Sequence, residues 1–134
     1  MDSLMIYDAI RLLLPSGLSI SYQTMDSSSP QSVGIFLYDN GDEEIDLDGD
    51  DVYRTCRVHI QMNSDRSISS LQTVLNTLTN FTYNIEKCYS PLSQISFLYA
   101  KHLGQRASVI GKNEFELNVC SCDVMLYYTF NVKG

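Results

Sequence analysis

The chain has 134 residues, of which 44% are hydrophobic and 19% charged, and its formal net charge is −7. This length and composition fit one globular domain with a buried core and exclude a chain that is disordered throughout. No apolar run reaches 18 residues, so we expect no membrane-spanning helix. No basic region precedes the first apolar residues, so we also expect no secretory signal.

The first part of the chain predicts one helix and two short strands. Apolar residues recur at helical spacing over residues 2–14, and the Pro-Ser-Gly sequence at 15–17 ends that helix. Short strands are expected at 18–22 and 33–38, on either side of a loop rich in serine.

A strongly alternating segment at 53–62 predicts a half-buried antiparallel strand. Its inner face would carry Cys56, Val58, Ile60 and Met62. A second helix is expected from Arg66 to about Asn80, with Ser64 or Asp65 as its cap. Its inward stripe would consist of Ile68, Leu71, Val74, Leu75 and Leu78.

The last third of the chain is predicted to be rich in strands. A connection at 81–91 leads to a strand at 95–101, with Ile95, Phe97 and Tyr99 expected on one side. A short strand at 107–110 and a turn at 111–114 precede the long final strand.

Apolar residues in the final strand, residues 115–132, change from odd to even positions along the sequence. This change predicts a bulge or bend near residues 121–123. The order of elements predicts an α+β fold in which two helices pack on a mainly antiparallel sheet, as one domain over residues 1–134.

Half of the acidic residues lie in one segment, residues 39–51, which contains no Lys or Arg. The eight carboxylates of this acidic segment are Asp39, Asp42, Glu43, Glu44, Asp46, Asp48, Asp50 and Asp51. The other 121 residues hold eight acids and nine bases, a net charge of about +1. The segment is therefore an anionic patch on a nearly neutral body, which repels phosphates or attracts cations or a basic partner.

The acidic segment lacks the pattern of a calcium-binding loop. With Gly49 at the sixth position, the twelfth position is Thr55, where a bidentate carboxylate is required. The predicted flanking elements are strands rather than helices. We interpret the segment as a solvated hairpin loop and expect no metal.

Cysteine and histidine give no catalytic pattern. Cys120 and Cys122 are two residues apart, not in the Cys-x-x-Cys spacing of zinc and redox sites, and we interpret them as buried packing residues. With Cys56 and Cys88 they fit free thiols in a reducing compartment. His59 and His102 have no local partner. We expect no catalytic, cofactor-binding or metal-binding residues.

Nucleic-acid binding is also disfavoured, because the nine Lys and Arg residues do not cluster beside the nine tyrosines. Phosphate-binding glycine loops, dinucleotide fingerprints and nucleophile elbows are absent from the sequence. What remains is a role in binding or assembly between proteins.

Three motifs carry a resemblance to a known family. The acidic loop ends in Asp48-Gly49-Asp50-Asp51-Val52-Tyr53-Arg54, the alternating strand contains Arg57-Val58-His59-Ile60-Gln61-Met62, and Gly111-Lys112-Asn113-Glu114 introduces the final strand. With the N-terminal helix, this layout resembles the minor capsid or tail terminator proteins of long-tailed bacteriophages. The Cys120/Cys122 pair and the longer acidic loop depart from the family pattern.

The resemblance implies a structural virion protein without catalytic residues or cofactors. It implies a ring, usually of six copies, that caps the tail tube and meets the head connector protein. Such a ring assembles in the host cytoplasm, becomes part of the virion neck, and has no membrane partner. Because Lys and Arg hold phosphates, we hypothesise that the acidic segment faces the lumen or the axial face, where genomic DNA passes without tight binding.

Other functions stay open at the level of sequence. A head–tail stopper or completion protein would have a similar size and charge. A calcium-dependent protein-binding module is a less supported alternative, and a small hydrolase that uses Cys or His is remote.

Overall fold

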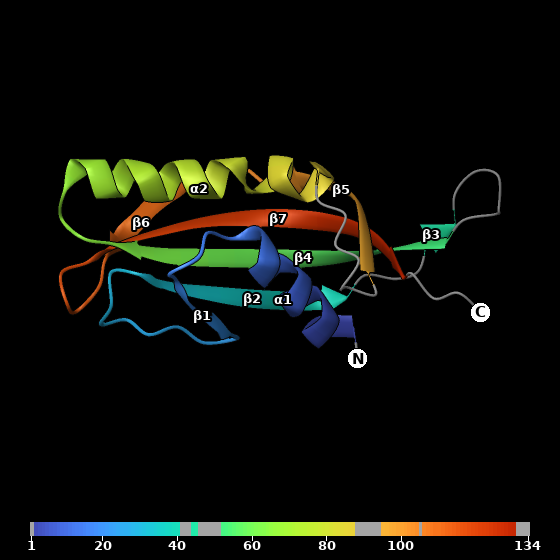
Figure 1. Ribbon diagram of the computed structural model, residues 1–134, viewed down its shortest axis with the longest axis horizontal. Helices are drawn as coiled ribbons and strands as arrows, with labels where there is room; N and C mark the ends of the chain where they lie inside the picture. The colour runs from blue at the N-terminus through green and yellow to red at the C-terminus, as the bar shows by residue number, and fades with distance from the viewer. Residues whose placement is uncertain (1, 41–43, 46–51, 88–94, 105, 131–134) are drawn as a thin grey trace.

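The computed structural model describes residues 2–40, 44–45, 52–87, 95–104 and 106–130. The elements in chain order are α1 (Asp2–Leu13), β1 (Ser19–Tyr22), β2 (Ser32–Asn40), β3 (Glu44–Ile45), β4 (Val52–Ser64), α2 (Ile68–Lys87), β5 (Ile95–His102), β6 (Ser108–Lys112) and β7 (Asn118–Phe130). Both helices pack on a mainly antiparallel sheet (Figure 1), so the predicted α+β class is confirmed.

The main sheet has the strand order β1-β2-β4-β7, with β5 and β6 both pairing with β7. β5 pairs with the second half of β7 and β6 with its first half, so these two strands follow one another along the same side of β7. β1 and β2 are parallel, and the other pairs are antiparallel. The short β3 pairs with the beginning of β4.

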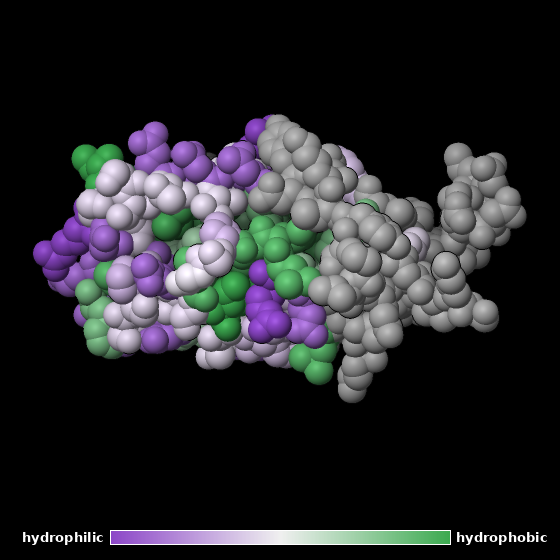
Figure 2. Space-filling view, in the orientation of Figure 1, coloured by the Kyte–Doolittle hydropathy of each residue, from purple (hydrophilic) through white to green (hydrophobic). Residues whose placement is uncertain are grey.

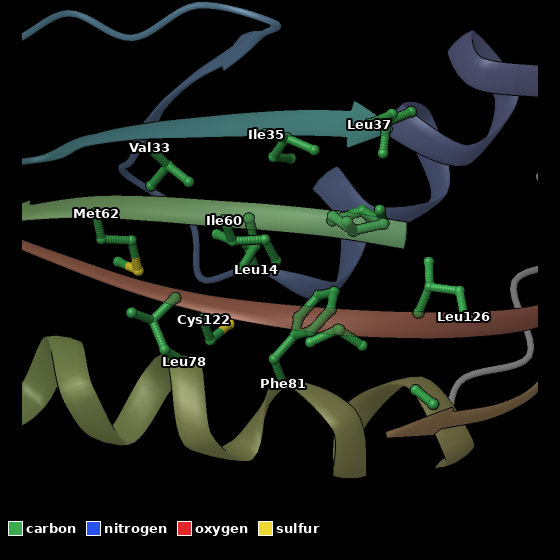
Figure 3. Packing of buried hydrophobic residues seen from close by; sticks show 14 of the residues in the cluster. Leu14, Val33, Ile35, Leu37, Ile60, Met62, Leu78, Phe81, Cys122 and Leu126 are labelled. Carbon is green, nitrogen blue, oxygen red and sulfur yellow. The ribbon is translucent and has the colours of Figure 1, made fainter. Parts of the chain in front are cut away.

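Alternation along the strands decides which side chains enter the core (Figure 3). The strands contribute Val33, Ile35, Leu37, Cys56, Val58, Ile60, Met62, Cys120, Cys122, Val124, Leu126 and Tyr128 to one buried face. The helices cover this face with Ile6, Ile10, Leu14, Val74, Leu78 and Phe81. The inner face predicted for the strand at 53–62 is therefore confirmed.

The second helix differs from its prediction at both ends. It begins at Ile68, because the Ser67 hydroxyl accepts the Ser70 amide at 3.1 Å and acts as the cap. Ile68 is 81% exposed, so its place in the inward stripe was wrong. The first turn lies beside the turn before β7, where Arg66 pairs with Glu116 at 2.9 Å, rather than over the sheet. The helix extends to Lys87 and so includes the buried Phe81, which the sequence assigned to a connection.

The bulge predicted in the final strand is wrong. β4 and β7 pair without interruption from Arg54↔Tyr128 to Ser64↔Asn118. β7 starts at Asn118, so the earlier odd-numbered apolar residues belong to a turn and need no change of phase. Asn113 organises this turn, since its Oδ1 accepts the amides of Phe115 and Leu117 at 2.8 and 3.2 Å.

Bulges occur instead in the two strands that pair with β7 on its outer side. The register of β5 shifts between Phe97 and Tyr99, and that of β6 shifts between Val109 and Gly111. Phe97 pairs with the buried Tyr128, whereas Tyr99 pairs with Tyr127 on the opposite face. The expectation that Phe97 and Tyr99 share a side was therefore wrong.

Candidate interaction surface

The acidic segment begins and ends in paired strands. Asp39 belongs to β2, and Glu44 and Ile45 form β3, which pairs with Tyr53 and Val52 of β4. The other six predicted site residues, Asp42, Glu43, Asp46, Asp48, Asp50 and Asp51, lie outside the described residues. Their place in a lumen or on an axial face stays a prediction.

The attachment of this segment lies at one end of the long central strands. β3 pairs with the first two residues of β4, whereas β6 pairs with the part of β7 that faces the last residues of β4. β4 has 13 residues, which corresponds to about 40 Å at the usual rise per residue. β3 and β6 accordingly lie at opposite ends of the long axis in Figure 1.

The sheet face opposite the helices carries a polar and aromatic row. Phe36, His59 and Asp123 occupy paired positions on β2, β4 and β7. His59 Nδ1 lies 3.0 Å from Asp123 Oδ1, and its Nε2 lies 2.9 Å from Gln61 Oε1. The Phe36 ring is 5.9 Å from the imidazole. Because both ring nitrogens have partners within the sheet, this histidine is positioned as part of a network rather than as a base for a substrate.

Tyrosines flank this row on the same face. The Arg57 guanidinium lies 5.9 Å from the centre of the Tyr38 ring, and the rings of Tyr99 and Tyr127 are 5.7 Å apart. Tyr38 is 52% exposed and Tyr99 48% exposed. Exposed tyrosines beside a cation are typical of surfaces that bind other proteins, since each offers an apolar ring with a polar tip.

Cys120 and Cys122 are both buried on the helix side of β7, as the sequence predicted. Burial raises the pKa of the Cys120 thiol. Burial and then the neighbouring Asp123 raise the pKa of Cys122 to about 12. Both thiols therefore stay protonated at neutral pH and act as small packing groups rather than as nucleophiles.

The edge formed by β5 and β6 exposes apolar side chains, which the sequence analysis did not predict. Val109 is 44% and Ile110 57% exposed. Proteins usually protect such an edge with charges, prolines or a covering element, because its free backbone groups can pair with another chain. Alternation alone could not identify this feature, since edge status depends on the pairing of the whole sheet.

The opposite edge of the sheet is β1, which pairs with β2 alone among the described strands. Next to it is a hollow of about 460 Å³ whose lining includes Leu12, Leu18 and Ile20. A second hollow of about 340 Å³, lined in part by Leu18, Met62 and Val74, separates the end of α1 from α2. Figure 2 shows an apolar area between the two helices on this face.

No three His, Cys, Asp or Glu side chains among the described residues lie close enough together to hold a metal ion. None of the helices in the described ranges has both the length and the hydropathy that crossing a membrane requires. The comparison with protein-family models gives no match, and the search of curated proteins gives no significantly similar sequence.

Proposed function

We propose that the chain is a structural virion protein of the tail-terminator type, a subunit of a ring that caps a phage tail tube and joins it to the head connector. The observation that carries the proposal is the separation of charge from body. Eight carboxylates occupy residues 39–51, and the rest of the chain is almost neutral. β2, β3 and β4 attach this segment at one end of the sheet.

This arrangement supports a role for the acidic segment at the axial end of a ring. Carboxylates lack the cations that hold phosphates, so DNA passes them without binding tightly. Several copies brought together in a ring would raise the local negative charge further. The neutral body can then pack against neighbours without strong repulsion.

The described surfaces also support assembly. Two edges of the sheet carry no further strand within the described residues, and one of them exposes Val109 and Ile110. α2 carries no charged residue from Ile68 to Ile85. Depletion of charge and exposure of apolar and aromatic groups are features of surfaces that other proteins cover.

Deleting the gene from the phage or prophage that encodes it tests the proposal, with electron microscopy of the lysate as the measurement. The expected result is DNA-filled heads without tails, together with free tails of abnormal length. Separated heads and tails of normal length would favour the head–tail stopper instead. Intact particles in normal number would contradict both functions. Expression of the chain in trans should restore joined particles and serves as the control.

A further inference from the structure

From the register of the sheet we infer that β6 of one copy pairs with β1 of the next, edge to edge and antiparallel, and that this contact builds the ring. The inference rests on the proposed function, because it names the contact by which the proposed ring would assemble. It commits to a second copy of this chain as the partner of both edges.

The two edges lie at the same level of the sheet. One ladder row runs through Ile20, Val33, Met62, Cys120 and Val109. The next row runs through Ser21, Gly34, Gln61, Ser121 and Ser108. A closed ring rotates each copy about its axis without a shift along it. A copy rotated about an axis along the strands would therefore bring β1 to the level of its neighbour's β6.

The strand directions also agree. β1 is parallel to β2, and three successive antiparallel pairings lead from β2 through β4 and β7 to β6. β6 thus runs opposite to β1 in the same molecule. In the rotated neighbour β1 keeps its direction, so the two edges meet as an antiparallel pair, which is the more stable kind of pairing.

Side-chain chemistry matches along this register. Val109 would lie opposite Ile20, beside the hollow that Leu12 and Leu18 help to line. Ser108 would lie opposite Ser21. The exposed Arg106, two residues before β6, would approach the segment after β1 that carries the exposed Asp26. Apolar and oppositely charged cross-strand neighbours both stabilise a sheet.

The backbone of β1 can accept such a partner. The Tyr7 hydroxyl donates to the Ile20 carbonyl at 3.3 Å, and a carbonyl oxygen has a second lone pair. The contact is heterologous, because it joins two different surfaces. It therefore leads around a ring rather than stopping at a dimer.

Cysteine cross-linking tests the pairing in purified particles. The double variant Ser21→Cys with Ser108→Cys would replace the wild-type chain, with Cys88→Ser in every variant, because Cys56, Cys120 and Cys122 are buried. Opposed residues of an antiparallel pair lie within disulfide range. Oxidation should give a ladder of covalent oligomers from the double variant and only monomers from S21C or S108C alone.

Each other outcome separates the two proposals. Dimers from either single variant would show a contact between like edges and overturn the inference. Monomers alone from the double variant, in particles that contain it, would overturn the edge pairing and leave the proposed function standing. Absence of the wild-type chain from particles, with normal particles after gene deletion, would overturn the proposed function itself.

A charge substitution gives an independent test. Val109→Lys with Ile110→Lys should lower incorporation into particles about tenfold or more, because burying unpaired charges costs several kcal/mol. Ile68→Lys is the matched control, since Ile68 is also an exposed apolar residue but lies off the edge. The control should incorporate normally, and both variants should keep the thermal unfolding transition of the wild-type monomer. Normal incorporation of the V109K/I110K variant would overturn the inference.

Discussion

The side chain of Gln23 pairs with the backbone of Leu37 in the manner of a strand residue. Its Oε1 accepts the Leu37 amide at 2.8 Å, and its Nε2 donates to the Leu37 carbonyl at 3.1 Å. β1 ends at Tyr22, so this side chain continues the pairing with β2 beyond the end of the strand.

Replacing Gln23 with alanine should therefore destabilise the fold. Two backbone groups of the buried Leu37 would lose their partners, at a cost of about 1–3 kcal/mol. The measurement is the free energy of unfolding in urea. Gln72→Ala, at an exposed position of α2, is the control and should change it by less than about 0.5 kcal/mol. Equal effects of the two substitutions would contradict this role of Gln23.

Asn63 holds the loop between β1 and β2. Its buried Nδ2 donates to the carbonyl oxygens of Asp26, Ser27 and Ser29 at 3.2, 3.4 and 3.1 Å. Asn63→Asp would place an acceptor against three acceptors, so we expect a loss of at least about 2–3 kcal/mol. Limited proteolysis should show faster cleavage within the loop.

Asn76→Asp makes the same chemical change at an exposed position of α2 and is the control for that experiment. It should leave both the unfolding free energy and the cleavage pattern unchanged. If N63D is as stable and as protease-resistant as the wild type, Asn63 does not hold the loop.

Asp65 should make the stability of the fold depend on pH in the acidic range. Hydrogen bonds from the backbone and then the side chain of Ser67 lower the pKa of this carboxyl below its usual 3.8. A carboxyl with a lowered pKa in the folded state stabilises above its unfolded pKa and loses that contribution as the pH falls. Between about pH 5 and pH 2, urea midpoints should fall more for the wild type than for Asp65→Asn. Identical pH profiles would refute this contribution.

Neutralising the acidic segment should impair joining without unfolding the chain. The combined variant Asp46→Asn, Asp48→Asn, Asp50→Asn and Asp51→Asn removes half of the segment's carboxylates. We expect an unfolding free energy within about 0.5 kcal/mol of the wild type, as for surface substitutions, but fewer joined or infectious particles. A variant that simply unfolds would mean that the segment has a structural role.

The sequence predicted the parts of the fold that depend on local periodicity. Alternation identified the buried face of β4, and helical spacing identified most of the buried stripe of α2. It failed where the outcome depends on pairing between distant segments. The bulges lie in β5 and β6, because these strands adjust their register to an uninterrupted β7.

The candidate surface shows the same limit. The charge of the acidic segment is evident from composition, whereas the exposed Val109 and Ile110 look like ordinary strand residues until the order of strands is known. The cap at Ser67 was missed because Ser64 and Asp65 are equally good caps by residue type. The hydrogen bond from Ser70 distinguishes Ser67.

The position of the chain in the particle tests the central claim most directly. Gold particles bound to a tag on the chain should appear in electron micrographs at one place per virion, the junction of head and tail. Label spread along the tail, label on the head surface, or absence of label from purified particles would contradict the claim that the chain is a ring subunit at the end of the tail.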